Sequence, residues 1–132
     1  FTMTPHVLCT AVEYDIPVVW VIWNNYAWAA IRDLQLGAFH GREIGTSFHA
    51  GSSGEPYNPD FGAMARSCGV DGVKVSCSSD FCDALEQAIA ANKPAVIDVE
   101  VDADVRPTSV GTWELPPLPH PEPAFGQAWR PG

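Results

Sequence analysis

The chain has 132 residues, of which 46% are hydrophobic and 17% are charged, a composition typical of one soluble globular domain with an apolar core. Its formal net charge of −9 and its seven Lys and Arg residues argue against nucleic-acid binding, because no basic stripe can form. The longest apolar stretch, Ile16 to Trp23, falls far short of the ~20 residues of a membrane helix, so we expect no membrane contact and a cytoplasmic setting.

The first predicted element is a helix from Thr4 to Tyr14. Thr4 suits its N-cap and Pro5 its first position, where the missing N–H has no cost. Its apolar positions recur at helical spacing, at Val7, Leu8, Ala11 and Val12. Because this pattern starts within a few residues of Phe1, we expect the chain to begin inside a domain, with the fold incomplete at its N-terminus.

A strand is predicted from Val18 to Trp23, where the chain is continuously apolar and β-branched, as in strands covered on both faces. This strand stops at Asn24-Asn25. A second helix is predicted from Ala27 to Leu36. One side of that helix carries Trp28, Ile31 and either Leu34 or Gln35.

Residues 37–59 are rich in Gly, Ser and His and show little periodicity, which predicts a long surface loop of the kind often found over a site. The next helix is predicted to start after Asp60, as its N-cap, and to run through Arg66. Gly69 is expected to close it, and a short strand follows from Gly72 to Val75.

The last predicted elements are a helix capped by Ser79 or Asp80 and running through Ala91, then a strand from Ala95 to Val101. Residues 106–132 hold seven of the twelve prolines, which excludes a regular helix or a central strand there. We therefore divide the chain into a domain, residues 1–105, and a proline-rich C-terminal tail, residues 106–132.

The alternation of buried strands with helices predicts the fold class. Parallel strands need crossover connections, and helices that make them cover the faces of the sheet. We expect an α/β fold with an open, mostly parallel sheet and helices on both faces.

Asn24-Asn25 lies where ligands bind in such folds, beyond the carboxyl end of a strand. A side-chain amide oxygen is a hard neutral ligand that suits Mg²⁺, and the helix beginning near Ala27 would direct free backbone N–H groups toward an anion. The alternative interpretation is a simple turn, because Asn tolerates left-handed conformations and caps helices well.

The residues before and after the Asn pair distinguish these interpretations. Together with the pair, they resemble the acetolactate synthase-like family of thiamine-diphosphate enzymes, over about Phe1 to Asp102. The segments that carry the resemblance are Phe1-x-Met3, Thr10-Ala11-Val12, Tyr14, Pro17-Val18, Asn24-Asn25, Tyr57 to Phe61, Ala65, Gly69, and Pro94 to Asp102. The chain departs from the family pattern at Val7, Trp23 and Ala29, which leaves the subfamily open.

The resemblance implies a site for thiamine diphosphate and Mg²⁺. By position, the side chain of Asn25 and the backbone carbonyl of Ala27 are the expected metal ligands, with Asn24 supporting the turn. The family's Gly-Asp-Gly triplet, which carries a further metal ligand, would lie immediately before Phe1. The expected cofactor-binding residues are Asn25, Tyr26, Ala27, Trp28 and Ala29.

Substrate contacts are expected on the same helix, at Ala30 and Ile31, with Trp28 a further candidate. Packing of Trp28 and Ile31 between helix and sheet is an equally good interpretation. The resemblance places the catalytic glutamate in another domain, so no catalytic residue is expected in this chain, which alone should be inactive.

The implied reaction is cleavage or ligation next to the carbonyl of a 2-keto acid or a related substrate, by a homodimer or homotetramer. Acetolactate synthesis, 2-keto acid or oxalyl-CoA decarboxylation and sulfoacetaldehyde acyl transfer all remain open. The alternative function is a non-catalytic α/β module, regulatory or structural, that keeps the family fold.

Two further sets of titratable residues stay open. His40 and His49 in the long loop could act as general acids, although the sequence places no partner beside them. Asp98, Glu100 and Asp102 alternate along the last strand and so share one face, which a solvated edge explains as well as acid–base work.

Overall fold

The computed structural model describes residues 1–105, so the predicted tail, 106–132, lies outside the described residues. The order of the elements is that predicted from the sequence. They are α1 (Val7–Glu13), β1 (Val19–Asn24), α2 (Ala29–Ala38), α3 (Phe61–Ser67), β2 (Asp71–Val75), α4 (Ser78–Ala91) and β3 (Ala95–Glu100). No helix in this part of the chain is long and apolar enough to cross a membrane.

The described strands form a parallel sheet in the order β1-β3-β2. Val19 and Asp71 both lie opposite Ala95, so the three strands start level with one another. The last strand in sequence therefore occupies the centre, which explains why Ala95 to Val99 are all buried.

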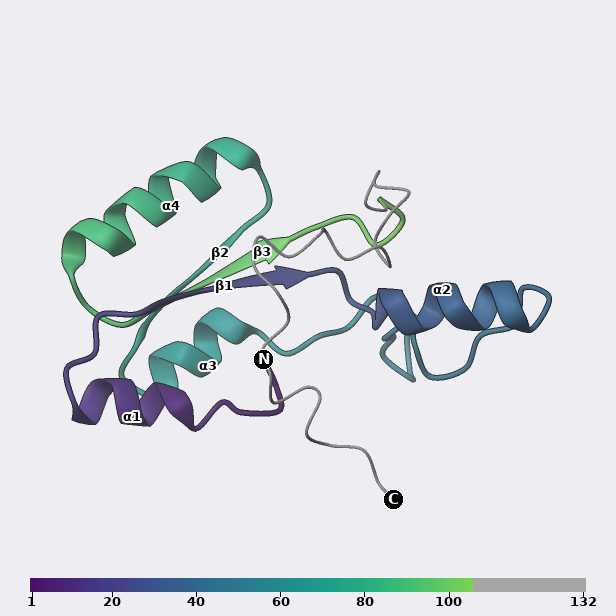
Figure 1. Ribbon diagram of the computed structural model, residues 1–132, viewed down its shortest axis with the longest axis horizontal. Coiled ribbons are helices and arrows are strands. Elements are labelled where there is room, and N and C mark those ends of the chain that lie inside the picture. The colour runs from purple at the N-terminus through teal and green to yellow at the C-terminus, as the bar shows by residue number, and fades with distance from the viewer. Residues whose placement is uncertain (106–132) are drawn as a thin grey trace, which may run out of the picture.

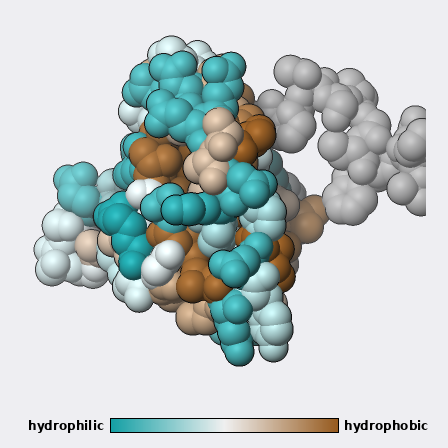
Figure 2. All heavy atoms as spheres, turned by 90° about the vertical axis from the view of Figure 1, so that its left-hand side faces the viewer, coloured by the Kyte–Doolittle hydropathy of each residue, from teal (hydrophilic) through white to brown (hydrophobic). Residues whose placement is uncertain are grey.

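Helices cover both faces of this sheet, as predicted (Figure 1). On one face, α1 and α3 bury a cluster of Leu8, Phe61, Ala65, Val70 and Val96. On the other face, α4 packs against Val75, Ile97 and Val99. From the end of the molecule opposite α2, hydrophobic side chains show as patches between hydrophilic ones (Figure 2).

Two glycines let α3 lie close to β2. A Cβ atom added to Gly72 would approach the carbonyl oxygen of Gly62 to 2.3 Å, so no side chain fits there. Arg66 extends the contact, since its guanidinium donates a hydrogen bond of 2.6 Å to the Gly72 carbonyl. This approach holds the first turn of α3 against the amino end of β2.

The helix α3 begins after Asp60 as predicted and ends at Ser67, one residue beyond the predicted Arg66. The Asp60 carboxylate accepts a hydrogen bond of 2.7 Å from the backbone N–H of Ala63, which caps the helix. Gly69 follows with a φ of 80°, the left-handed conformation expected after a helix.

Three predicted helix starts are wrong; α2, predicted from Ala27 to Leu36, begins at Ala29 and ends at Ala38. The helix α1 begins at Val7, with Thr4 and Pro5 in the turn before it and His6 at the N-cap. The helix α4 begins at Ser78, so that Ser79 and Asp80 lie in its first turn; its N-cap is Cys77, without a side-chain cap. Neither α1 nor α4 has a side-chain hydrogen bond at its N-cap.

The helix α2 lies beside the carboxyl ends of the strands and apart from the helices that cover the sheet (Figure 1). None of its residues is buried within the described part of the chain. Trp28 is 63% exposed and Ile31 is 48% exposed. The interpretation of these two residues as helix-to-sheet core is therefore wrong for the described residues.

Candidate functional site

The candidate site is built on the turn that follows β1. The backbone N–H of Val101 donates to the Asn24 carbonyl at 3.0 Å, which continues the pairing of β1 with β3 to the last residue of β1. The Asn24 side chain is buried, and its Oδ1 accepts hydrogen bonds from the side-chain amide of Asn58 and the backbone N–H of Tyr26. Asn24 thus joins the strand end, the turn and the long loop.

Asn25 makes a local turn of its own. Its side-chain Oδ1 accepts a hydrogen bond of 3.2 Å from the backbone N–H of Ala27. This contact agrees with the simple-turn interpretation of the Asn pair. It also leaves the oxygen a second lone pair, because an amide carbonyl has two. The turn and a metal-ligand role are therefore compatible.

Tyr26, between the two expected ligands, has a φ of 55°, in the left-handed region. Its hydroxyl donates to Glu100 Oε1 at 2.9 Å and accepts from Lys74 Nζ at 2.9 Å. Lys74 Nζ also lies 3.4 Å from Glu100 Oε2. The hydrogen bond with Tyr26 is the largest influence that raises the pKa of Lys74, and likewise the largest that lowers the pKa of Glu100.

Ala27 pairs with Ser47 of the long loop in an antiparallel bridge. The bonds of this bridge come from neighbouring residues: Trp28 N–H donates to the Thr46 carbonyl and Phe48 N–H to the Tyr26 carbonyl, both at 2.8 Å. Within the described residues, no hydrogen bond ends on the carbonyl of Ala27 itself. This oxygen is consequently a free acceptor.

Two cavities meet at Asn25 and Ala27. The larger, of about 540 Å³, is also lined by Tyr26, and the smaller, of about 130 Å³, by Trp28. The Trp28 ring packs edge-on against Phe48, with ring centroids 5.5 Å apart. The structure thus gathers the first four of the expected cofactor-binding residues around one turn.

The remaining expected residues lie elsewhere. Ala29, Ala30 and Ile31 form the first turn of α2 and line neither of these two cavities. Of the two loop histidines, His49 lines the larger cavity, whereas His40 lies away from both, in a left-handed conformation after α2.

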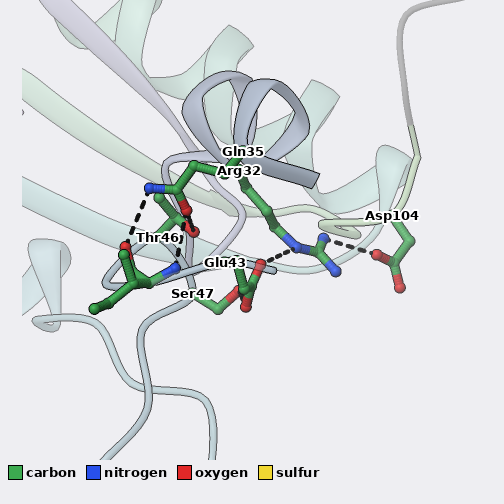
Figure 3. A network of polar contacts seen from close by, with 7 residues as sticks. Arg32, Gln35, Glu43, Thr46, Ser47 and Asp104 are labelled. Atoms are coloured by element: carbon green, nitrogen blue, oxygen red, sulfur yellow. Dashed lines mark hydrogen bonds and ion pairs between the residues drawn. The ribbon is translucent and has the colours of Figure 1, made fainter. Parts of the chain in front are cut away.

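A polar network, which we call the Arg32 latch, joins α2 to two other segments (Figure 3). Arg32 Nε lies 2.9 Å from Glu43 in the loop, and its Nη1 lies 3.0 Å from Asp104 beyond β3. Ser47 donates to the other Glu43 oxygen at 2.8 Å. The Ser47 hydroxyl and Arg32 lower the pKa of Glu43, while Asp104 and Glu43 raise that of Arg32.

A side-chain amide on α2 holds the next part of the loop. Gln35 Oε1 accepts from the backbone N–H of Ile44 at 2.9 Å and from the Thr46 hydroxyl at 3.3 Å. Its Nε2 donates to the Ile44 carbonyl at 3.3 Å. Together with the latch, these contacts order the segment that closes one side of the larger cavity.

The interpretation of Asp98, Glu100 and Asp102 as a solvated edge is wrong for Asp98, which is buried. Its side chain is 1% exposed, and neither carboxylate oxygen has a hydrogen-bond partner within the described residues. Burial raises the pKa of Asp98 more than nearby Asn24 and Lys74 lower it. Glu100 is exposed at the strand end, where it meets Tyr26.

Comparison with known proteins assigns the chain to a family. Residues 1–99 match the family described as thiamine pyrophosphate enzyme, C-terminal TPP binding domain; thiamine pyrophosphate is thiamine diphosphate. The chain belongs to this family. The match includes β1, the Asn pair, α2 and nearly all of β3.

Individual relatives agree with this assignment. A probable acetolactate synthase large subunit of Methanocaldococcus jannaschii is 31% identical over 77% of this chain. An acetolactate synthase large subunit of Parasynechococcus marenigrum is 33% identical over 90%, and a sulfoacetaldehyde acetyltransferase of Castellaniella defragrans is 31% identical over 70%. The chain spans only 15% to 19% of the length of these relatives.

Sequence reasoning missed several residues of this thiamine pyrophosphate-binding domain that shape the turn. Lys74 and Glu100 lie 48 and 74 positions from Tyr26, and Asp104 lies 72 positions from Arg32. A weak signal existed for Glu100, since strand alternation places its side chain on the same face as Asp98. No sequence pattern connects Lys74 or Arg32 with the site.

Proposed function

We propose that this domain binds the diphosphate of thiamine diphosphate in a Mg²⁺-dependent way, and that the Asn25 side chain and the Ala27 carbonyl would hold the ion. The observation that carries the proposal is that the residues of these two oxygens, Asn25 and Ala27, line both cavities, and that no hydrogen bond within the described residues ends on the Ala27 carbonyl. The Asn25 amide oxygen and the Ala27 carbonyl oxygen are neutral, hard ligands, and such ligands suit Mg²⁺ where phosphate oxygens supply the negative charge.

The start of α2 supports the binding of an anion beside these ligands. The helix has ten residues and its N-cap, Trp28, makes no side-chain cap. The first backbone N–H groups of such a helix lack intrahelical partners and carry partial positive charge. A diphosphate at this end would receive hydrogen bonds that Ala29 and its neighbours offer from the backbone alone.

We further propose that the domain serves an enzyme acting on 2-keto acids or related substrates, by acetolactate synthase-like carboligation or by decarboxylation. The names of the relatives, acetolactate synthases and a sulfoacetaldehyde acetyltransferase, support this class. The cofactor, when bound, supplies the nucleophilic carbon and the electron sink. The residues of this chain bind and orient it, and Ala30 and Ile31 remain proposed substrate contacts.

Assembly as a homodimer or homotetramer is part of the same proposal. The apolar side chains of Ile31 and Leu34 on α2 are 48% and 55% exposed, and that of its N-cap, Trp28, is 63% exposed. Apolar side chains that gather on one exposed face are typical of a surface that another protein covers. Coverage by a second subunit would remove them from water. Light scattering of the full-length protein measures this directly; a monomer at working concentration would contradict it.

Titration calorimetry of the full-length protein with thiamine diphosphate, with Mg²⁺ and then with EDTA, tests the metal site. Asn25→Ala should weaken Mg²⁺-dependent binding by about tenfold or more, a loss of about 1.4 kcal/mol per factor of ten. Asn25→Asp keeps an oxygen and should lose less. Gln87→Ala, which removes an exposed side-chain amide from α4, is the matched control.

The outcomes separate the proposal from its alternative. Unchanged affinity in Asn25→Ala would remove Asn25 from the metal site. No binding of the cofactor by the wild-type protein at any Mg²⁺ concentration would favour a non-catalytic module that keeps the family fold.

A further inference from the structure

Tyr26 holds an unusual backbone conformation at a critical position. It lies between Asn25 and Ala27, and its φ of 55° is uncommon for any residue other than Gly, Asn or Asp. A bulky residue in this region costs free energy and persists only where its surroundings hold it there.

The side chain of Tyr26 is fixed by the carboxyl-terminal ends of two strands. Lys74 of β2 donates to its hydroxyl, and the hydroxyl donates to Glu100 of β3, both at 2.9 Å. Lys74 Nζ also lies 5.6 Å from the centre of the Tyr26 ring, within cation–π distance. We call these three residues the tyrosine clamp.

The Tyr26 hydroxyl joins the three residues of the clamp, because it bonds to both Lys74 and Glu100. The side chains of Lys74 and Glu100 are 45% and 42% exposed, so their direct ion pair at 3.4 Å contributes little by itself. A phenol that accepts from the cation and donates to the carboxylate satisfies both partners in one geometry. Without the hydroxyl, neither Lys74 nor Glu100 has a hydrogen bond to the turn within the described residues.

The clamp also adjusts charge at the cavity. Glu100 lines the larger cavity beside Asn25 and Ala27. An unpaired carboxylate there would repel an anionic group near the turn, and Lys74 neutralises it. The same contact that fixes Tyr26 thus removes an unfavourable charge.

We infer that the tyrosine clamp positions the metal ligands: it keeps Tyr26 left-handed so that the Asn25 side chain and the Ala27 carbonyl converge on one ion. Tyr26 acts through its two neighbours and is a positioning residue rather than a contact to the cofactor. This inference rests on the proposed metal site. It predicts that loss of the clamp raises the Mg²⁺ requirement for thiamine diphosphate binding.

Tyr26→Phe in the full-length protein tests the clamp, because it removes only the hydroxyl. The Mg²⁺ concentration for half-maximal binding of thiamine diphosphate should rise about fivefold or more, and excess Mg²⁺ should restore the affinity for the cofactor. Tyr14→Phe, which removes an exposed hydroxyl next to α1, should leave the Mg²⁺ requirement unchanged. An unchanged requirement in Tyr26→Phe would overturn the inference.

Tyr26→Asn separates positioning from direct contact. Asn adopts the left-handed conformation more readily than Phe, so it should raise the Mg²⁺ requirement less than Phe does. A Tyr26 ring that contacted the cofactor would give the reverse order, with Phe close to wild type and Asn impaired. That reverse order would contradict the clamp.

Lys74→Met provides a second route that leaves Tyr26 in place. It should raise the Mg²⁺ requirement as Tyr26→Phe does, and the double variant should be little worse than either, because the two residues act as one unit. Full additivity would refute the clamp.

Asn25→Ala distinguishes the two proposals. If Asn25→Ala leaves the Mg²⁺ requirement unchanged, the proposed metal site is wrong. If Asn25→Ala raises the requirement but Tyr26→Phe and Lys74→Met leave it unchanged, only the clamp is wrong.

Discussion

The sheet with α1, α3 and α4 is held by apolar burial, whereas α2 with the loop 39–60 is held mainly by polar contacts. In the sheet region, Leu8, Val96 and Ile97 are 0% exposed. In the α2 region, the helix has no buried residue, and Arg32 and Gln35 make its connections to the loop.

This difference places the candidate site at the border of a stable and a less stable region. Asn24 belongs to the sheet, while Ala27 pairs with the loop. Regions with few buried apolar contacts open at a lower free energy than the core of a domain. The site therefore has one side fixed by packing and another that can open for a ligand.

The largest expected effect compares two isoleucines. Ile97→Ala, in the fully buried central strand, should lower the free energy of unfolding by about 2–5 kcal/mol, because it leaves a cavity. Ile44→Ala, in the loop held by α2 and with a side chain that is 83% exposed, should change it by less than about 0.5 kcal/mol. Denaturant unfolding of the full-length protein measures both, and similar losses would abolish the distinction between the regions.

Two glycines give the next effect, with opposite signs. Gly72→Ala brings a Cβ onto the Gly62 backbone and should destabilise by about 1–3 kcal/mol or more. Gly37→Ala, in the last turn of α2 with open space around it, should stabilise by up to about 0.5–1 kcal/mol through helix propensity. Thermal unfolding reports both signs; destabilisation by Gly37→Ala would show that α2 is packed tightly after all.

The buried carboxyl of the central strand predicts a pH dependence. Burial raises the pKa of Asp98, so the folded state holds its proton more tightly than the unfolded state does. The resulting stabilisation is complete below the ordinary Asp range and is lost as pH rises through the raised pKa.

Asp98→Asn cannot titrate and provides the measurement. Its stability relative to wild type should increase as pH rises from the ordinary Asp range through the raised pKa, and then level off. Denaturant unfolding over a pH series records this difference. A difference that stays constant with pH, or falls, would contradict a raised pKa.

The smallest change in global stability is expected at the latch. Arg32→Gln should cost no more than about 1 kcal/mol, because its ion pairs are partly exposed. Hydrogen exchange should nevertheless accelerate at the amides of Trp28 and Phe48, which bond to the loop and the turn. Arg42→Gln, in the loop and outside the latch, is the control, and equal exchange in both variants would contradict a local role.

Strand periodicity and composition were enough to predict the sheet. The apolar runs before the Asn pair and after Pro94 became β1 and β3, and their parallel pairing follows from the helices between them. The position of Asn24-Asn25 at a strand end followed from the same pattern. The resemblance added the family, which the comparison confirmed over residues 1–99.

Contacts distant in sequence could not be predicted. Strand alternation predicted which face of the sheet carries the Asp98 side chain, but not that this side chain would be buried. No local sequence pattern predicts that α2 lies beyond the end of the sheet. Thr4 is a good capping residue, yet the chain before α1 turns so that the helix starts at Val7. Tertiary context decided each of these outcomes.

The most direct test of the central claim is a crystal structure of the full-length protein with Mg²⁺ and thiamine diphosphate. The account predicts an ion within about 2.0–2.1 Å of both Asn25 Oδ1 and the Ala27 carbonyl oxygen, with Tyr26 still left-handed between them. An ion bound to the cofactor but held by neither oxygen would contradict it.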